Sequence, residues 1–133
     1  MSRRGLREKT FRLLFRMEFH DEEEFLDQKD LFFGDEEQLE MTEEDVSFVM
    51  DICDKITEKL PQIDERISEK TTGWSIERIG KAELAILRLA VYEIMFDDSI
   101  PTSVTINEAV ELAKKYGSND TSSFVNGVLA KFV

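Results

Sequence analysis

The chain has 133 residues, a length that fits one domain, and a formal net charge of −12 at pH 7. Its single cysteine, Cys53, excludes an internal disulfide. The longest stretch without a charged residue, Thr121 to Ala130, is much shorter than the ~20 apolar residues that a membrane-spanning helix needs. We therefore expect a cytoplasmic protein that does not enter a membrane.

The charge is divided unevenly along the chain. Residues 1–16 contain six basic side chains and one acid, whereas residues 18–45 contain 14 acids and one lysine. An acidic protein repels polyanions at long range, but a local cationic patch can still bind one. The start of the chain is therefore a candidate contact for an anionic partner.

The sequence has helical periodicity and no alternating strand pattern. The first helix is expected to bury one face, formed by Leu6, Thr10, Leu13, Leu14 and Met17, with Phe11 at its margin. Cations in a first helical turn oppose the helix dipole, so we expect Arg3 and Arg4 to lie in a frayed arm. A short acidic helix is predicted over residues 21–33, followed by a loop over 34–41.

Two further helices are predicted over residues 42–60 and 61–71. Thr42, followed by three acids, is a typical N-cap, and Pro61 separates the two helices because proline breaks a helix interior. We expect one continuous buried seam, formed by Val46, Val49, Cys53, Ile56, Leu60, Ile63 and Ile67. Its position in this seam predicts that Cys53 is a buried, inert thiol.

The C-terminal half predicts a central helix over residues 81–96 that is apolar nearly all round, so its polar residues Glu83, Arg88 and Glu93 need partners. Helices over 102–116 and 121–132 follow, with Gly117 as the stop between them. The last two helices also carry Asn107, Asn126 and Gly127 among apolar residues. A glycine inside a helix indicates either tight helix packing or close approach by a partner. In total, the sequence predicts an all-α fold of about seven helices.

Residue patterns that support catalysis are scarce. There is no glycine-rich phosphate loop and no metal-ligand spacing, and the only histidine, His20, is expected at a solvated helix end. We therefore expect no catalytic residue, no metal site and no cofactor.

The C-terminal sequence carries a family resemblance, in the segments ELAILRLAVYEIMF, IPTSVTINEAVELAKKYG and NDTSSFVNGVLAKF. Together with the basic first helix, the acidic middle and Trp74 before the central helix, they resemble the NusB family of bacterial transcription antitermination factors. The resemblance implies a non-catalytic protein in which two helical subdomains, about 1–73 and 74–133, pack together. NusB proteins bind the boxA element of ribosomal RNA leader transcripts together with NusE, a small-subunit ribosomal protein. The pair joins a complex on RNA polymerase that resists termination.

The resemblance also implies site residues. Those expected at the RNA are Arg3, Arg4, Arg7, Phe15, Asp120 and Phe124. Phe15 stands where tyrosine is common, and Ser122 and Ser123 stand where some relatives have His and Lys, so affinity for RNA alone is expected to be weak.

Glu77 and Glu83 match acidic positions that face NusE, although acids near a helix N-terminus also favour its dipole. Arg88 is either an RNA contact or half of a buried ion pair, and the pair is the favoured interpretation.

Two other interpretations compete with this one. The chain could be the detached RNA-binding domain of a ribosomal RNA cytosine methyltransferase, but no cofactor-binding domain follows Val133. Those domains also tend to have alanine in place of Gly127 and an arginine after the leucine of FVNGVLAK. An acidic helical adaptor that binds only protein would explain the net charge but not the basic start.

Some NusB relatives dimerise, and the sequence does not distinguish a monomer from a homodimer.

Overall fold

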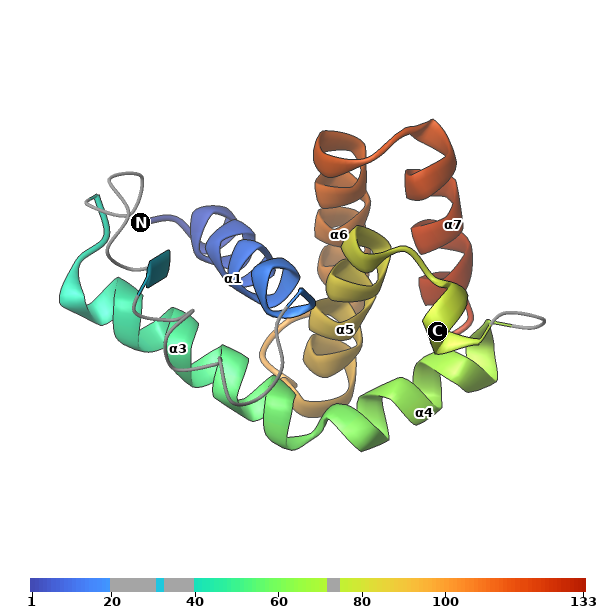
Figure 1. The fold of residues 1–133 in the computed structure, drawn as a ribbon, viewed down its shortest axis with the longest axis horizontal. Helices are drawn as coiled ribbons and strands as arrows, with labels where there is room; N and C mark the ends of the chain where they lie inside the picture. The colour runs from blue at the N-terminus through green and yellow to red at the C-terminus, as the bar shows by residue number, and fades with distance from the viewer. Residues whose placement is uncertain (20–30, 33–39, 72–74) are drawn as a thin grey trace. The chain divides into compact units, whose positions relative to one another are not determined.

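The computed structural model describes residues 1–19, 31–32, 40–71 and 75–133. Within them it contains six long α-helices, one 3₁₀ helix and no strand, which confirms the all-α prediction. The elements are α1 (Arg3–Met17), α3 (Glu43–Glu58), α4 (Leu60–Lys70), η3 (Ile76–Arg78), α5 (Lys81–Phe96), α6 (Thr102–Tyr116) and α7 (Asn119–Ala130), as drawn in Figure 1. His20, Trp74 and almost all of the predicted acidic helix and loop lie outside the described residues. The chain divides into two compact units, Met1–Lys55 and Ile56–Val133.

The first unit contains α1, which begins earlier than expected. Ser2 caps the helix, because its Oγ accepts a 3.0 Å hydrogen bond from the Gly5 N–H. The prediction of a frayed arm is therefore wrong: Arg3 and Arg4 occupy the first helical turn. Phe11, expected at the margin of the buried face, is 1% exposed and belongs to the core.

The start of α3 confirms the predicted N-cap. The Asp45 N–H donates to Thr42 Oγ1 at 3.1 Å, and the Thr42 N–H donates back to Asp45 Oδ2 at 3.0 Å. This bond from the Thr42 backbone is the main cause that lowers the pKa of the Asp45 carboxyl below its ordinary value. Further along α3, the Cys53 thiol is fully buried, with its Sγ 3.9 Å from the Thr10 carbonyl oxygen, so the predicted burial of this residue is confirmed.

The predicted division into two helices is confirmed, although the break lies at Lys59, two residues before Pro61. Helix α3 ends at Glu58, and α4 starts at Leu60 with Pro61 in its first turn, where a missing N–H costs nothing.

None of the helices in the described part of the chain is long and apolar enough to cross a membrane.

Helix α5 is the centre of the second unit, where it packs against α4, α6 and α7. Its bounds are those predicted, and most of its side chains are buried. The expected partners of its three polar residues are present. Arg88 forms two 2.9 Å hydrogen bonds with the carboxylate of Asp64 on α4.

The other two polar residues of α5 accept hydrogen bonds from threonines. Glu93 Oε1 accepts a 2.9 Å bond from the Thr105 hydroxyl, and Glu83 Oε1 accepts a 3.1 Å bond from the Thr121 hydroxyl. Helix α5 is thus tied through Glu93 to α6 and through Glu83 to α7.

Helix α6 has the predicted bounds, but α7 begins at Asn119 instead of residue 121 and ends at Ala130 instead of 132. It starts earlier because Ser118 is the N-cap and accepts a 3.4 Å hydrogen bond from the Thr121 N–H. Within α7, a Cβ added at Gly127 would meet nothing within 4 Å. Tight packing against another helix therefore does not explain this glycine.

Candidate nucleic-acid interface

The first candidate surface is the N-terminal half of α1. Arg3 and Arg4 are exposed, and Arg7 is half-buried one turn further along. The first turn of α1 contains no acidic residue, so its arginines lie at the positive end of the helix dipole. An anion bound beside them would gain from both the guanidinium groups and the dipole.

Phe15 lies on the same helix within a row of aromatic rings. Its ring centroid is 5.9 Å from that of Phe11, with the planes at 24°, and 5.2 Å from that of Phe19, at 83°. Phe11 is buried, Phe15 is half-buried and Phe19 is 56% exposed, so the row runs from the core to the surface. Sequence reasoning missed Phe19, although its spacing of four residues from Phe15 is the signal that would have found it.

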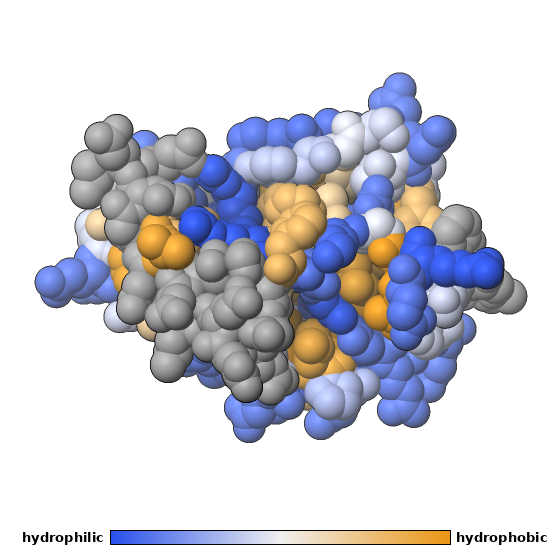
Figure 2. Space-filling model, viewed as in Figure 1, coloured by the Kyte–Doolittle hydropathy of each residue, from blue (hydrophilic) through white to orange (hydrophobic). Residues whose placement is uncertain are grey.

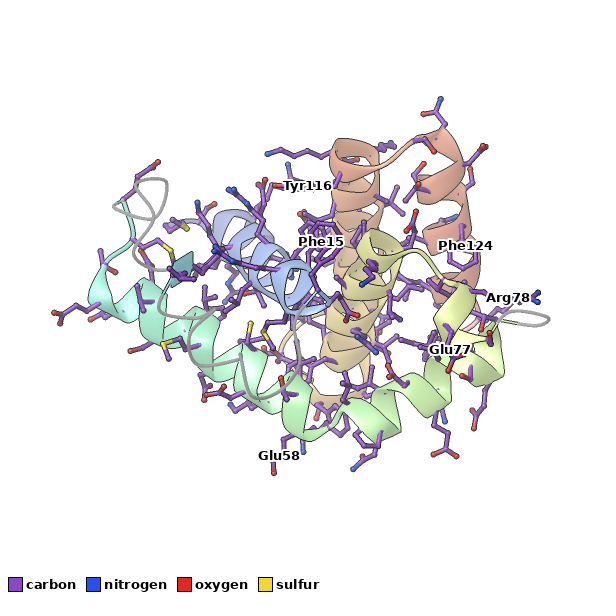
Figure 3. The ribbon with its side chains drawn as sticks, in the orientation of Figure 1. Phe15, Glu58, Glu77, Arg78, Tyr116 and Phe124 are labelled. Atoms are coloured by element: carbon purple, nitrogen blue, oxygen red, sulfur yellow. The ribbon has the colours of Figure 1, made fainter. Side chains whose placement is uncertain are left out.

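The second candidate surface lies on the other unit, around the starts of α5 and α7. A hollow of about 250 Å³ is lined by Arg78, Ile79, Gly80, Glu83, Asp120, Thr121 and Phe124. Figure 3 labels Phe124 on α7 and Arg78, the last residue of η3. The structure thus brings Glu83, Asp120 and Phe124 together, three residues that the sequence had assigned to two different partners. Arg78 was not predicted, and no motif marks it.

The two acidic positions assigned to a protein partner differ in their surroundings. Glu77 is exposed on η3 and does not line the hollow. Glu83 is half-buried, its Oε1 is bonded to Thr121, and its carboxylate lies over Gly80, where an added Cβ would collide with Oε2. Glu83 is therefore part of the packing between α5 and α7 as well as part of a surface.

Two serines in α7 also differ. Ser122 is buried, and its hydroxyl donates a 2.9 Å hydrogen bond to the Asn119 carbonyl oxygen, whereas Ser123 is exposed. Only Ser123 therefore presents its hydroxyl at the surface in place of a cation. Arg88 is not assigned to either candidate surface, because its guanidinium is paired with the Asp64 carboxylate.

Other kinds of site are not evident in the described residues. Among them, no three His, Cys, Asp or Glu side chains are grouped so that they could hold a metal ion. Among the residues that are coloured in Figure 2, hydrophilic ones are frequent and hydrophobic ones form patches between them.

Comparison with known proteins identifies the family. The NusB family matches residues 4–133. This chain belongs to the NusB family. The chain is 51% identical to the transcription antitermination protein NusB of Agathobacter rectalis, with 99% of each chain covered. It is 48% identical to NusB of Lachnoclostridium phytofermentans, with 100% of this chain and 99% of the relative covered.

Solved structures of NusB proteins have the same fold. NusB of T. maritima superposes with a TM-score of 0.83 at 34% identity, covering 99% of this chain and 90% of the other. A crystal structure of the antitermination factors NusB and NusE in complex with double-stranded RNA gives a TM-score of 0.81 at 27% identity, covering 98% of this chain and 94% of the other. These comparisons confirm the family resemblance and the fold that it implies.

Proposed function

We propose that this protein is a non-catalytic transcription antitermination factor of the cytoplasm. It binds boxA-type RNA of ribosomal RNA leader transcripts together with NusE and helps RNA polymerase to resist termination. The observation that carries the proposal is the match to the NusB family over residues 4–133. A related chain, 27% identical, has been crystallised with NusE and RNA, which supports the choice of both partners.

The RNA surface in this proposal has one part on each unit. On the first unit, Arg3, Arg4 and Arg7 neutralise phosphates, and Phe15 offers a ring on which an unstacked base can lie. On the second unit, Asp120 and Phe124 line the hollow beside α7. Phosphate contacts position RNA without reading its sequence, so discrimination for boxA is assigned to the Phe15 and Phe124 regions.

The protein partner is assigned to the acidic positions Glu77 and Glu83. Glu77 is the better residue for a test, because it is exposed. Replacing Glu83 would also break its hydrogen bond with Thr121. Reversing the charge of Glu77 brings like charges together with a basic partner. In Glu77→Lys we expect NusE to associate about tenfold more slowly at low salt, with thermal stability unchanged.

Glu65→Lys is the matched control for that variant. Glu65 is an exposed glutamate on α4, and its replacement changes the net charge of the protein by the same amount. If both variants slow the association equally, the effect is one of net charge, and Glu77 is not at the interface.

The function itself is tested by fluorescence anisotropy with a labelled boxA-type RNA and a scrambled RNA of the same composition. Each RNA is titrated with this protein, with and without its NusE homologue. We expect weak binding by the protein alone and tighter, boxA-selective binding with NusE. Binding of NusE without any RNA binding, even at low salt, would refute the RNA assignment and favour the adaptor interpretation.

A further inference from the structure

The starts of α6 and α7 are each tied to α5 by a hydrogen bond from a threonine to a glutamate. Thr105, in the first turn of α6, donates to Glu93 near the C-terminal end of α5. Thr121, in the first turn of α7, donates to Glu83 near the N-terminal end. The two bonds have the same chemistry and comparable burial at the threonine, but only the second lies beside the proposed RNA surface.

The side chain of Thr121 is confined on several sides. Its hydroxyl lies 3.3 Å from Ser118 Oγ, and the Ser118 oxygen also accepts the Thr121 N–H. A Cβ added at Gly117 would lie 2.7 Å from the Thr121 Cβ, Cγ2 and Oγ1 atoms, so the residue at 117 must be small for Thr121 to keep its place. We call Gly117, Ser118, Thr121 and Glu83 the α7 anchor.

The anchor controls where two proposed RNA contacts lie. Asp120 directly precedes Thr121, and Phe124 follows it by three residues on the same side of the helix. Both residues line the same hollow as Thr121 and Glu83. A shift or rotation of the first turn of α7 would therefore move Asp120 and Phe124 together.

We propose that Thr121 is a positioning residue, whose hydrogen bond to Glu83 holds Asp120 and Phe124 in the geometry that RNA requires. This inference rests on the proposed function, because it assumes that those two side chains meet RNA. Thr121 itself is buried and acts through α7. The carboxylate acceptor makes the bond stronger than one between two neutral groups, so its loss loosens the helix start.

The variants follow from the geometry. Thr121→Val keeps the shape of the side chain and removes the hydroxyl, whereas Thr121→Ser keeps the hydroxyl. Thr105→Val makes the same chemical change at the Glu93 bond and is the matched control. We expect Thr121→Val to weaken binding of a boxA-type RNA, measured with NusE present, by about fivefold, the effect of one lost hydrogen bond.

Two further readouts separate positioning from a general loss of stability. The dependence of affinity on salt should keep its slope in Thr121→Val, because no phosphate-binding cation is removed. Thr121→Ser should restore most of the affinity. Thr105→Val should leave RNA affinity unchanged even if its melting temperature falls as much as that of Thr121→Val.

Hydrogen exchange of the free protein tests the anchor without RNA. In Thr121→Val the amides of residues 122–125 should exchange faster, by about fivefold, while those at the start of α6 keep their wild-type rates. In Thr105→Val the amides at the start of α6 should exchange faster, while those of residues 122–125 keep their wild-type rates. If the wild type binds no RNA, the proposed function fails, and this measurement still shows whether the bond holds α7.

The proposal is overturned if Thr121→Val binds RNA as tightly as the wild type. It is also overturned if Thr105→Val, at equal loss of melting temperature, weakens RNA binding equally, or if exchange at residues 122–125 is unchanged. Should Thr121→Val fail to fold, Gly117→Ala carries the test. Gly117→Ala keeps the hydroxyl but crowds it, and it should lower RNA affinity in the same way, while wild-type affinity in this variant would overturn the proposal.

Discussion

Replacing Arg88 with methionine tests whether this residue stabilises the fold or contacts RNA. The guanidinium makes two 2.9 Å hydrogen bonds to the Asp64 carboxylate, and the two side chains are only 12% and 24% exposed. Methionine keeps an apolar side chain of similar length, but it removes the two N–H groups that donate to the Asp64 carboxylate. Breaking a fully buried pair costs about 3–5 kcal/mol, and the partial exposure of Asp64 lets water recover some of it. We therefore expect Arg88→Met to lower the free energy of unfolding by about 2–3 kcal/mol.

The assay is urea unfolding at pH 7, followed by circular dichroism at the helical band. Asp64→Leu and the double variant complete a thermodynamic cycle with Arg88→Met. The double variant removes both charges, so we expect it to recover most of the loss and lie within about 1 kcal/mol of the wild type. A coupling free energy near zero would mean that the pair contributes nothing.

RNA binding separates the two interpretations of Arg88. Under conditions where Arg88→Met remains folded, its affinity for boxA-type RNA with NusE should equal that of the wild type, because the guanidinium is engaged by Asp64. Wild-type stability combined with a large loss of RNA affinity would refute this reasoning and make Arg88 an RNA contact.

Three further predictions concern α1, α7 and α3. Replacing Arg3, Arg4 and Arg7 with alanine should flatten the slope of log affinity against log salt by about 2, since each phosphate contact on a single strand contributes about −0.7; an unchanged slope in a salt titration would place the RNA site elsewhere. Gly127→Ala should raise stability by up to about 1 kcal/mol in thermal unfolding, because alanine favours the helix and its Cβ meets nothing; a lower melting temperature would contradict this. The lowered pKa of Asp45 means that its ionised form stabilises the fold above the pKa of the unfolded chain, and that this stability is lost as the pH falls through the folded pKa. Asp45→Asn should therefore be less stable than the wild type at pH 7, with a difference that shrinks below about pH 4; a difference independent of pH would rule out the charge as its cause.

The limits of sequence reasoning are visible at α1 and α7. The cations of the first turn predicted a frayed arm from dipole energetics alone, but the Gly5 N–H donates to Ser2 Oγ and the helix begins at Arg3. The start of α7 was placed two residues late, although Ser118 followed by Asp120 is a recognisable cap signal. Both errors concern helix ends, where one side-chain bond decides the boundary.

The candidate site was only partly accessible from sequence. The family resemblance supplied Asp120, Phe124 and Glu83 as separate positions, and the fold brought them to one hollow with Thr121 and Arg78. Neither Thr121 nor Arg78 carries a local pattern that marks it. Their place in the hollow follows from helix packing, which sequence periodicity does not describe.

The sequence by itself determined the helical fold, the bounds of α5 and α6, the division into α3 and α4 and the membership of the NusB family. These features depend on interactions within one or two helical turns, or on a pattern of residues along the chain. The tertiary structure alone decided which partners the polar residues of α5 have: Arg88 pairs with a carboxylate 24 residues away, and Glu83 with a hydroxyl 38 residues away. Such pairs form only when helices pack, because the side chains that meet are set by the geometry between helices and not by the spacing within one.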